Sequence, residues 1–201
     1  QESTSTFSIL NFGADFVGII PSDLESDGTG ENYGAELTLE KFLDKGFYFL
    51  VTTSIYESFY TASDGGKYNT AFNGNFTFNS LAGYEIRFAE GKSALTFDAK
   101  FTLNGGRRYT PILLEESIAA GVEVRDYSNV FNNQYANYVR GDFRIAFKVV
   151  GEKVTQEWAI DLQNITNRRN IFYTQYSPES ESIRTTYQTG FLPIGQYRIY
   201  F

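Results

Sequence analysis

The chain has 201 residues, of which 42% are hydrophobic and 17% aromatic, and it carries a formal net charge of −7. This composition is too apolar for a disordered chain, and the acidic balance argues against nucleic acid, which is bound by clusters of basic residues. Cys and His are absent, which excludes disulfides, Cys/His metal sites and Ser/His/Asp or Cys/His nucleophilic sites. We therefore expect no enzymatic activity and no cofactor.

Alternation of apolar and polar residues predicts eight β-strands, because successive side chains of a strand point to opposite faces. The first is weak and the fifth alternates without interruption over its whole length. The predicted strands cover residues 3–12, 33–40, 47–56, 71–88, 95–104, 139–149, 157–163 and 190–201. The last of these ends on an aromatic residue, Phe201.

The predicted connections alternate in length along the chain. The long and medium ones cover residues 13–31, 62–68, 105–137 and 166–185, whereas residues 43–46, 89–92 and 151–153 form short turns. All long connections therefore lie at one end of an up-and-down meander. Transmembrane β-barrels have this asymmetry, with short turns on the periplasmic side and longer loops outside.

One face of the predicted strands carries ionised residues in mid-strand. They include Asp98, Lys100, Arg140, Asp142, Arg144 and Asp161. The alternation alone fits either a soluble barrel with a dry interior or a membrane barrel with a polar interior. The many Phe, Trp, Leu and Ile side chains of the other face would overfill a small barrel, so we expect them to face lipid and the charged residues to face the lumen.

Six stretches of the sequence, in the same order, resemble the carboxy-terminal end of TonB-dependent outer-membrane receptors. The resemblance is to the branch that has a carboxypeptidase-regulatory-like amino-terminal domain, and it covers almost the whole chain. The stretches are residues 7–16 (FSILNFGADF), 32–39 (NYGAELTL), 45–50 (KGFYFL), 105–111 (GGRRYTP), 158–170 (WAIDLQNITNRRN) and 187–201.

The resemblance implies an all-β fold, an antiparallel transmembrane barrel of about 22 strands around a plug. Residues 1–201 would supply about eight carboxy-terminal strands, without the plug and the amino-terminal strands. The implied function is TonB-driven import of a large scarce solute across the bacterial outer membrane: an iron chelate, a vitamin-like cofactor, an oligosaccharide or a peptide. The implied partners are outer-membrane lipid, the rest of the barrel and plug, the TonB complex and a surface lipoprotein.

Specific residues acquire candidate roles from this resemblance. In the closing strand, Tyr197, Ile199 and Phe201 would form the signal for barrel assembly. Arg107 and Arg108 are candidates for contact with an anionic ligand or a lipopolysaccharide phosphate. We favour a structural role for these two arginines where a strand leaves the membrane.

An acidic stretch early in the chain resembles half of a calcium-binding loop. Asp23, Glu25, Asp27 and Glu31 have the required spacing, but Gly34 stands where such a loop needs Glu. We favour a solvated loop over a metal site.

Two other readings of the whole chain remain open. It could be a complete eight-stranded outer-membrane barrel with a structural or adhesin-like role, or a soluble ligand-binding barrel.

Overall fold

A computed structural model describes residues 28–62 and 64–201. Its main element is a sheet in which β1, β2, β4, β5, β8, β9 and β12 are hydrogen-bonded in this order, with short β3 added to β2. Every pairing within it is antiparallel. The all-β, antiparallel, up-and-down prediction is confirmed for this part of the chain, and the predicted strand over 3–12 lies outside the described residues.

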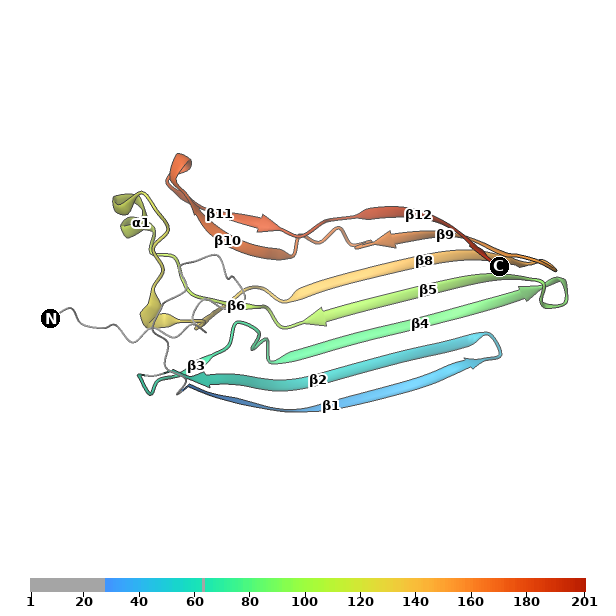
Figure 1. Ribbon diagram of the computed structural model, residues 1–201, viewed down its shortest axis with the longest axis horizontal. Coiled ribbons are helices and arrows are strands. Elements are labelled where there is room, and N and C mark those ends of the chain that lie inside the picture. The colour runs from blue at the N-terminus through green and yellow to red at the C-terminus, as the bar shows by residue number, and fades with distance from the viewer. Residues whose placement is uncertain (1–27, 63) are drawn as a thin grey trace.

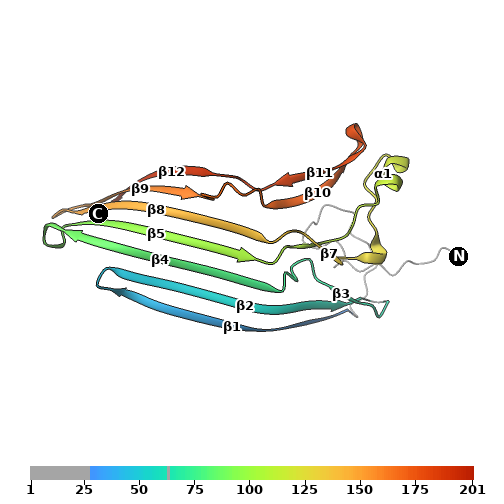
Figure 2. The same ribbon diagram turned by 180° about the vertical axis from the view of Figure 1, so that it is seen from behind.

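The long strands reproduce the seven later predictions, because each has the period-two alternation that buries or exposes one whole face. Figures 1 and 2, which view the sheet from opposite sides, show them running side by side. The strands are β1 (Thr29–Asp44), β2 (Phe47–Thr61), β4 (Phe76–Phe88), β5 (Ser93–Asn104), β8 (Tyr138–Val150), β9 (Thr155–Gln163) and β12 (Leu192–Tyr200).

The short turns lie together at one end of the sheet (Figure 1). Between β1 and β2, Lys45 and Gly46 have φ values of 50° and 85°. Positive φ at both central residues defines the tight hairpin turn whose twist matches that of the flanking strands. At the β4–β5 turn, Ala89 and Glu90 also have positive φ, within the 3-10 turn η2 (Ala89–Gly91).

The longer connections lie at the opposite end and contain structure of their own (Figure 1). Here β3 (Lys67–Asn69) lies between β2 and β4, and two further connections carry short elements. The connection after β5 contains β6 (Arg108–Tyr109), α1 (Leu114–Ala120), η3 (Tyr127–Asn129) and β7 (Asn133–Gln134).

Two predicted boundaries are wrong. Residues 166–185 are not a polar loop, because β10 (Ile171–Ser177) and β11 (Ser182–Tyr187) form a hairpin closed by η4 (Pro178–Ser180). The predicted strand over 71–88 starts only at Phe76. Before it, Asn75 has a φ of 71°, which interrupts the extended backbone.

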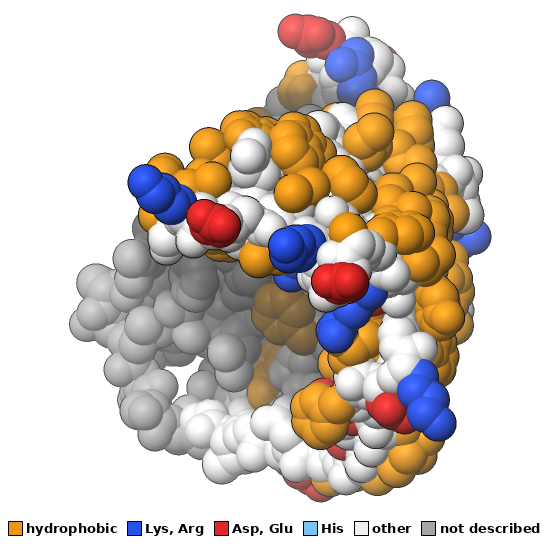
Figure 3. Space-filling model, turned by 90° about the vertical axis from the view of Figure 1, so that its right-hand side faces the viewer, with side chains coloured by type: hydrophobic (Ala, Val, Ile, Leu, Met, Phe, Trp, Pro, Cys, Tyr) orange, Lys and Arg blue, Asp and Glu red, His pale blue; other side chains and the backbone are white. Residues whose placement is uncertain are grey.

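The sheet is curved and open. Figure 3, which looks along it from the short-turn end, shows hydrophobic side chains gathered on the outside of the curve and a hollow on the other side. Within the described residues β1 and β12 are edges that pair on one side only, so the structure contains no closed barrel. Among these residues no helix is long and apolar enough to cross a membrane.

The small hydrophobic core of the described residues lies at the loop end, away from the middle of the sheet. Tyr60, Ala62, Ala71, Val130 and Phe131 form it, with Tyr68 packed alongside. Along the sheet, in contrast, large apolar side chains stay exposed, including Leu37 (55%), Phe101 (40%) and Ile160 (56%). Within the described residues, no second layer therefore covers these side chains.

Candidate functional site

The charged side chains of neighbouring strands meet on one face of the sheet, here called the polar face. Strand register places Tyr48 opposite Gly83, Gly83 opposite Asp98 and Asp98 opposite Arg144. Arg144 in turn lies opposite Asp161. A single cross-strand row thus joins β2, β4, β5, β8 and β9, because antiparallel register puts facing side chains about 5 Å apart.

The first part of the row depends on a glycine, Gly83. The Tyr48 hydroxyl donates a hydrogen bond to Asp98 Oδ1 across the intervening strand. A Cβ atom on Gly83 would meet the Tyr48 ring and would lie 2.5 Å from Asp98 Oδ1. Gly83 therefore provides the space in which the ring crosses β4.

Arg144 is the centre of the second part. Its Nη1 donates to Asp161 Oδ1 at 3.1 Å and to Gln196 Oε1 at 3.4 Å, and its Nη2 donates to Glu157 Oε1 at 2.7 Å. The side chains of Arg144, Asp161 and Glu157 are only 23%, 17% and 16% exposed. One guanidinium thus neutralises two half-buried carboxylates and links β8, β9 and β12.

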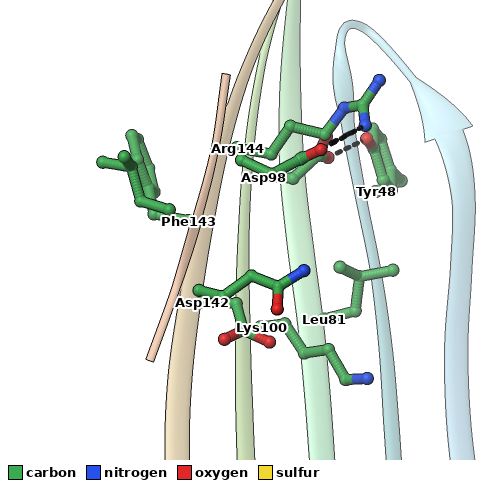
Figure 4. Close-up of a pocket in the computed structure, with 10 residues that line it drawn as sticks. Tyr48, Leu81, Asp98, Lys100, Asp142, Phe143 and Arg144 are labelled. Carbon is green, nitrogen blue, oxygen red and sulfur yellow. Dashed lines mark hydrogen bonds and ion pairs between the residues drawn. The ribbon is translucent and has the colours of Figure 1, made fainter. Parts of the chain in front are cut away.

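A cavity of about 420 Å³ lies against this row, lined among others by Tyr48, Asp98, Lys100, Asp142 and Arg144. Figure 4 shows Phe143 pointing away from the side on which Tyr48, Asp98 and Arg144 lie. Further along the polar face, Arg140 Nε donates to Asp142 Oδ1 at 2.6 Å. The six residues predicted to face a lumen therefore share one face, and their role toward a lumen stays a prediction.

The opposite face, here called the apolar face, carries rows of rings. Phe97 and Phe143 lie 6.5 Å apart between ring centroids, and Phe147, Trp158 and Tyr197 follow one another at 6.2 and 5.5 Å. The two rows cross β5, β8, β9 and β12. Aromatic pairs of this geometry stabilise neighbouring strands even where the rings remain exposed.

The residues predicted as the assembly signal lie in and after β12. Tyr197 and Ile199 share the parity of the apolar face, and Tyr197 donates its hydroxyl hydrogen to Gln156 Oε1 at 2.8 Å. Phe201 is fully exposed. The role of these residues as an assembly signal stays a prediction.

The two arginines of the GGRRYTP stretch have different surroundings. Arg108 Nε donates to Asn73 O at 2.8 Å and its Nη2 donates to Asn75 Oδ1 at 3.3 Å, while its Nη1 donates to Asn132 O at 3.4 Å, so it ties three loop segments together. Arg107 is exposed, with its guanidinium carbon 5.8 Å from the centroid of the Phe72 ring. The favoured structural role thus suits Arg108, whereas Arg107 is accessible.

Three members of the calcium candidate, Asp23, Glu25 and Asp27, lie outside the described residues. Glu31 belongs to β1 and pairs with Lys67 Nζ at 2.5 Å, which raises the pKa of Lys67. In residues 28–62 and 64–201 no group of three or more Asp and Glu side chains is placed to hold a metal ion.

A second cavity, of about 460 Å³, lies where β9 and β12 meet the hairpin that the sequence did not predict. Tyr138, Arg140, Phe172, Tyr187 and Gln188 are among its lining residues. Its lining thus combines aromatic rings with polar and charged side chains.

The wall of this second cavity depends on Asn164, which is 2% exposed. Its Nδ2 donates to Arg168 O at 3.0 Å and to Thr189 O at 3.2 Å, and its backbone N–H donates to Asp142 Oδ1 at 2.8 Å. Asn164 therefore joins the end of β9, the start of β12 and the polar face. In the sequence, Asn164 is only one member of the stretch 158–170 that resembles the receptor family. That resemblance did not predict its burial.

The hairpin is also held by the connection after β5. Tyr135 stacks on Tyr109 at 4.1 Å between ring centroids, and its hydroxyl lies 2.7 Å from Thr174 Oγ1. Glu123 Oε2 accepts a hydrogen bond from the Tyr176 amide at 2.8 Å. The connection and the hairpin thus form one continuous layer over the loop end of the sheet.

The carboxylates and guanidiniums of the polar face are mostly engaged with each other, and a hydrogen-bonded network of this kind holds its members in fixed positions. Comparison of the chain with family models, with curated proteins and with solved structures found no match.

Proposed function

We propose that this chain forms part of the wall of an outer-membrane transporter that imports a large scarce solute with energy supplied through TonB. The observation that carries the proposal is the two-faced sheet. Apolar and aromatic side chains stay exposed along one face, and the ion pairs centred on Arg144 lie on the other. Alternation of this kind is the signature of strands placed between lipid and water.

The exposed side chains of the apolar face must be shielded from water in the intact protein. Trp158 is 44% exposed and Ile160 56%, and they continue rows that extend over several strands. A contiguous apolar surface of this extent on a protein marks contact with a membrane or another protein. Hydrocarbon fits a mainly apolar face that curves around the outside of the sheet (Figure 3).

The two open edges favour a large barrel. Within the described residues β1 and β12 pair on one side only, and they do not pair with each other. Unpaired backbone N–H and C=O groups are not tolerated in a bilayer. Strands from outside residues 28–201 would therefore complete the wall, as the resemblance to the 22-stranded receptors implies.

A soluble ligand-binding barrel is disfavoured by the same geometry. Such a barrel would place Phe101 and Ile160 inside and Arg144 outside, whereas Arg144 is the least exposed of these three side chains. A complete eight-stranded barrel would need a further strand between β1 and β12, because these two do not pair with each other within the described residues.

Fractionation of cells that produce the full-length protein tests the proposal. We expect the protein in the outer-membrane fraction, resistant to alkaline extraction, and several times larger than 22.8 kDa. Uptake of its solute should stop when TonB is deleted. A full-length product near 22.8 kDa, or one recovered in buffer without detergent, would overturn the proposal.

A further inference from the structure

The arginines of the described residues divide into two groups by their partners. Half of them form ion pairs with a carboxylate: Arg87, Arg125, Arg140, Arg144 and Arg198. The other half have no carboxylate at ion-pair distance within residues 28–62 and 64–201: Arg107, Arg108, Arg168, Arg169 and Arg184. A guanidinium without a carboxylate partner among these residues keeps hydrogen-bond donors that an anion from outside the chain can use.

Four of the five uncompensated arginines lie around one short segment, residues 133–137, at the loop end of the sheet. Arg108 is paired with Gln134 between β6 and β7, and the Tyr135 amide donates to Arg107 O at 3.0 Å. On the other side, Arg168 Nη2 donates to Asn137 O at 3.3 Å, and Arg169 follows it in the chain. The positive charge is therefore local.

Three of the four are accessible. Arg107, Arg168 and Arg169 are exposed, and we call them the arginine cluster. Arg108 is excluded from it, because its guanidinium is held by Asn73, Asn75 and Asn132. The cluster thus presents planar guanidinium groups with donors left over, the arrangement that binds phosphate in a bidentate manner.

Exposed apolar side chains lie beside the cluster. Phe72 is 59% exposed and lies under the Arg107 guanidinium. Ile165 is 51% exposed and lies close to Gly141, which is paired with Phe101. Exposed hydrocarbon and uncompensated cations therefore occur together, at the level where the apolar face ends and the loops begin.

We propose that the arginine cluster binds the phosphate groups of a membrane lipid whose acyl chains lie on the apolar face beside Phe72 and Ile165. The inference rests on the proposed outer-membrane location. It adds a specific lipid contact at the outer rim, of the lipopolysaccharide type, because phosphate supplies the charge and the acyl chains supply the apolar contact. A free anion would use the arginines and leave Phe72 and Ile165 uncovered.

Native mass spectrometry of the detergent-purified full-length protein tests the site, with phosphorylated lipid A and its dephosphorylated form as probes. The test variant combines Arg107→Gln, Arg168→Gln and Arg169→Gln. The control combines Lys45→Gln, Lys92→Gln and Lys153→Gln, which removes three exposed cations at the opposite, short-turn end. Circular dichroism and the amount of each variant in the outer membrane verify folding.

We expect the wild type and the control to retain phosphorylated lipid A, and the arginine variant to bind it roughly tenfold or more weakly, since hydrogen bonds to charged groups are the strong ones. Equal binding by all three proteins, or equal binding of the dephosphorylated lipid, overturns the site. Displacement of the lipid by inorganic phosphate alone assigns the cluster to a small anion and overturns the lipid. Absence of the wild type from the outer membrane overturns the proposed function as well, whereas equal binding by proteins found there overturns only the lipid site.

Discussion

Tyr48 and Asp98 are joined by a hydrogen bond that crosses a complete strand, because Gly83 between them has no side chain. The contact ties β2 to β5 over β4, in addition to the backbone ladders. It also fixes the carboxylate of Asp98 at the edge of the polar cavity. The position of one glycine therefore determines both a packing contact and the shape of the wall.

Replacing Gly83 by Ala is expected to lower the free energy of unfolding by about 1–3 kcal/mol, because the added methyl group overpacks the site. Gly195→Ala is the control, since a Cβ there has no neighbour within 4 Å. Denaturant unfolding in detergent, followed by circular dichroism, measures the difference. Tyr48→Ala in the Gly83→Ala background should recover part of the loss, and equal stability of the two glycine variants would contradict the argument.

Arg144→Met is expected to lower the free energy of unfolding by roughly 2–4 kcal/mol, because it leaves the largely buried Asp161 without a cation and Glu157 with only the longer contact to Arg198 at 3.6 Å. Arg87→Met removes an ion pair whose arginine side chain is 64% exposed, and should cost about 0–1 kcal/mol. The same unfolding assay compares the two. A loss no larger for Arg144 than for Arg87 would show that the network on the polar face contributes little.

Asn164 should be needed for the shape of the connection between β9 and β12. Its φ of 50° is one that Gly also adopts without strain. Asn164→Gly therefore keeps the backbone and removes the side-chain hydrogen bonds to Thr166, Arg168 and Thr189. We expect limited proteolysis of this variant to cleave within residues 165–191 faster than in the wild type, with the sheet strands still protected.

Tyr135→Phe should loosen the hairpin from the connection that holds it. The change removes the hydroxyl that lies 2.7 Å from Thr174 Oγ1 and accepts from the Thr174 amide at 3.0 Å, but keeps the ring stacked on Tyr109. We expect the loss of these hydrogen bonds to cost about 1 kcal/mol, which corresponds to roughly fivefold faster amide exchange in β10. Hydrogen exchange read by mass spectrometry tests this, and Tyr109→Phe, which keeps the same stack, is the matched variant and should exchange like the wild type.

Asp126 provides a pH-dependent contact in the connection after β5. Hydrogen bonds from the Ser128 side chain and from Asn129 lower the pKa of Asp126 below its ordinary value of 3.8. A lowered pKa in the folded state means that the contact stabilises fully above the ordinary value and is lost as pH falls through the lowered one. The ¹³C shift of the Asp126 carboxyl group should titrate below pH 3.8. A midpoint at or above this value would be inconsistent with the hydrogen bonds from Ser128 and Asn129.

The alternation of residues 95–104 was sufficient to predict β5 and to assign Asp98 and Lys100 to one face. Period-two patterning depends only on local geometry, which is why the long strands could be read from the sequence. The Arg144 network could not be read in this way. It depends on the register between β8, β9 and β12, which places Asp161 and Glu157, far from Arg144 in sequence, beside its guanidinium.

The hairpin of β10 and β11 was missed because its alternation is not one of apolar and polar residues. Tyr173, Thr174 and Gln175 show no apolar–polar alternation. The structure holds the hairpin through Tyr135, which contacts Thr174, and through Glu123, which accepts from the Tyr176 amide. The deciding contacts come from residues nearly forty to more than fifty positions away in sequence, so no local pattern contained them.

The open edges of β1 and β12 have a consequence for how the molecule is made. A segment whose two edge strands have unpaired backbone N–H and C=O groups can pair with a second copy of itself as readily as with its proper neighbour. If it were produced by itself, we would expect it to form intermolecular β-sheets. If the chain lies in the outer membrane as proposed, we expect it to fold and to pair with its adjoining strands together, at the membrane.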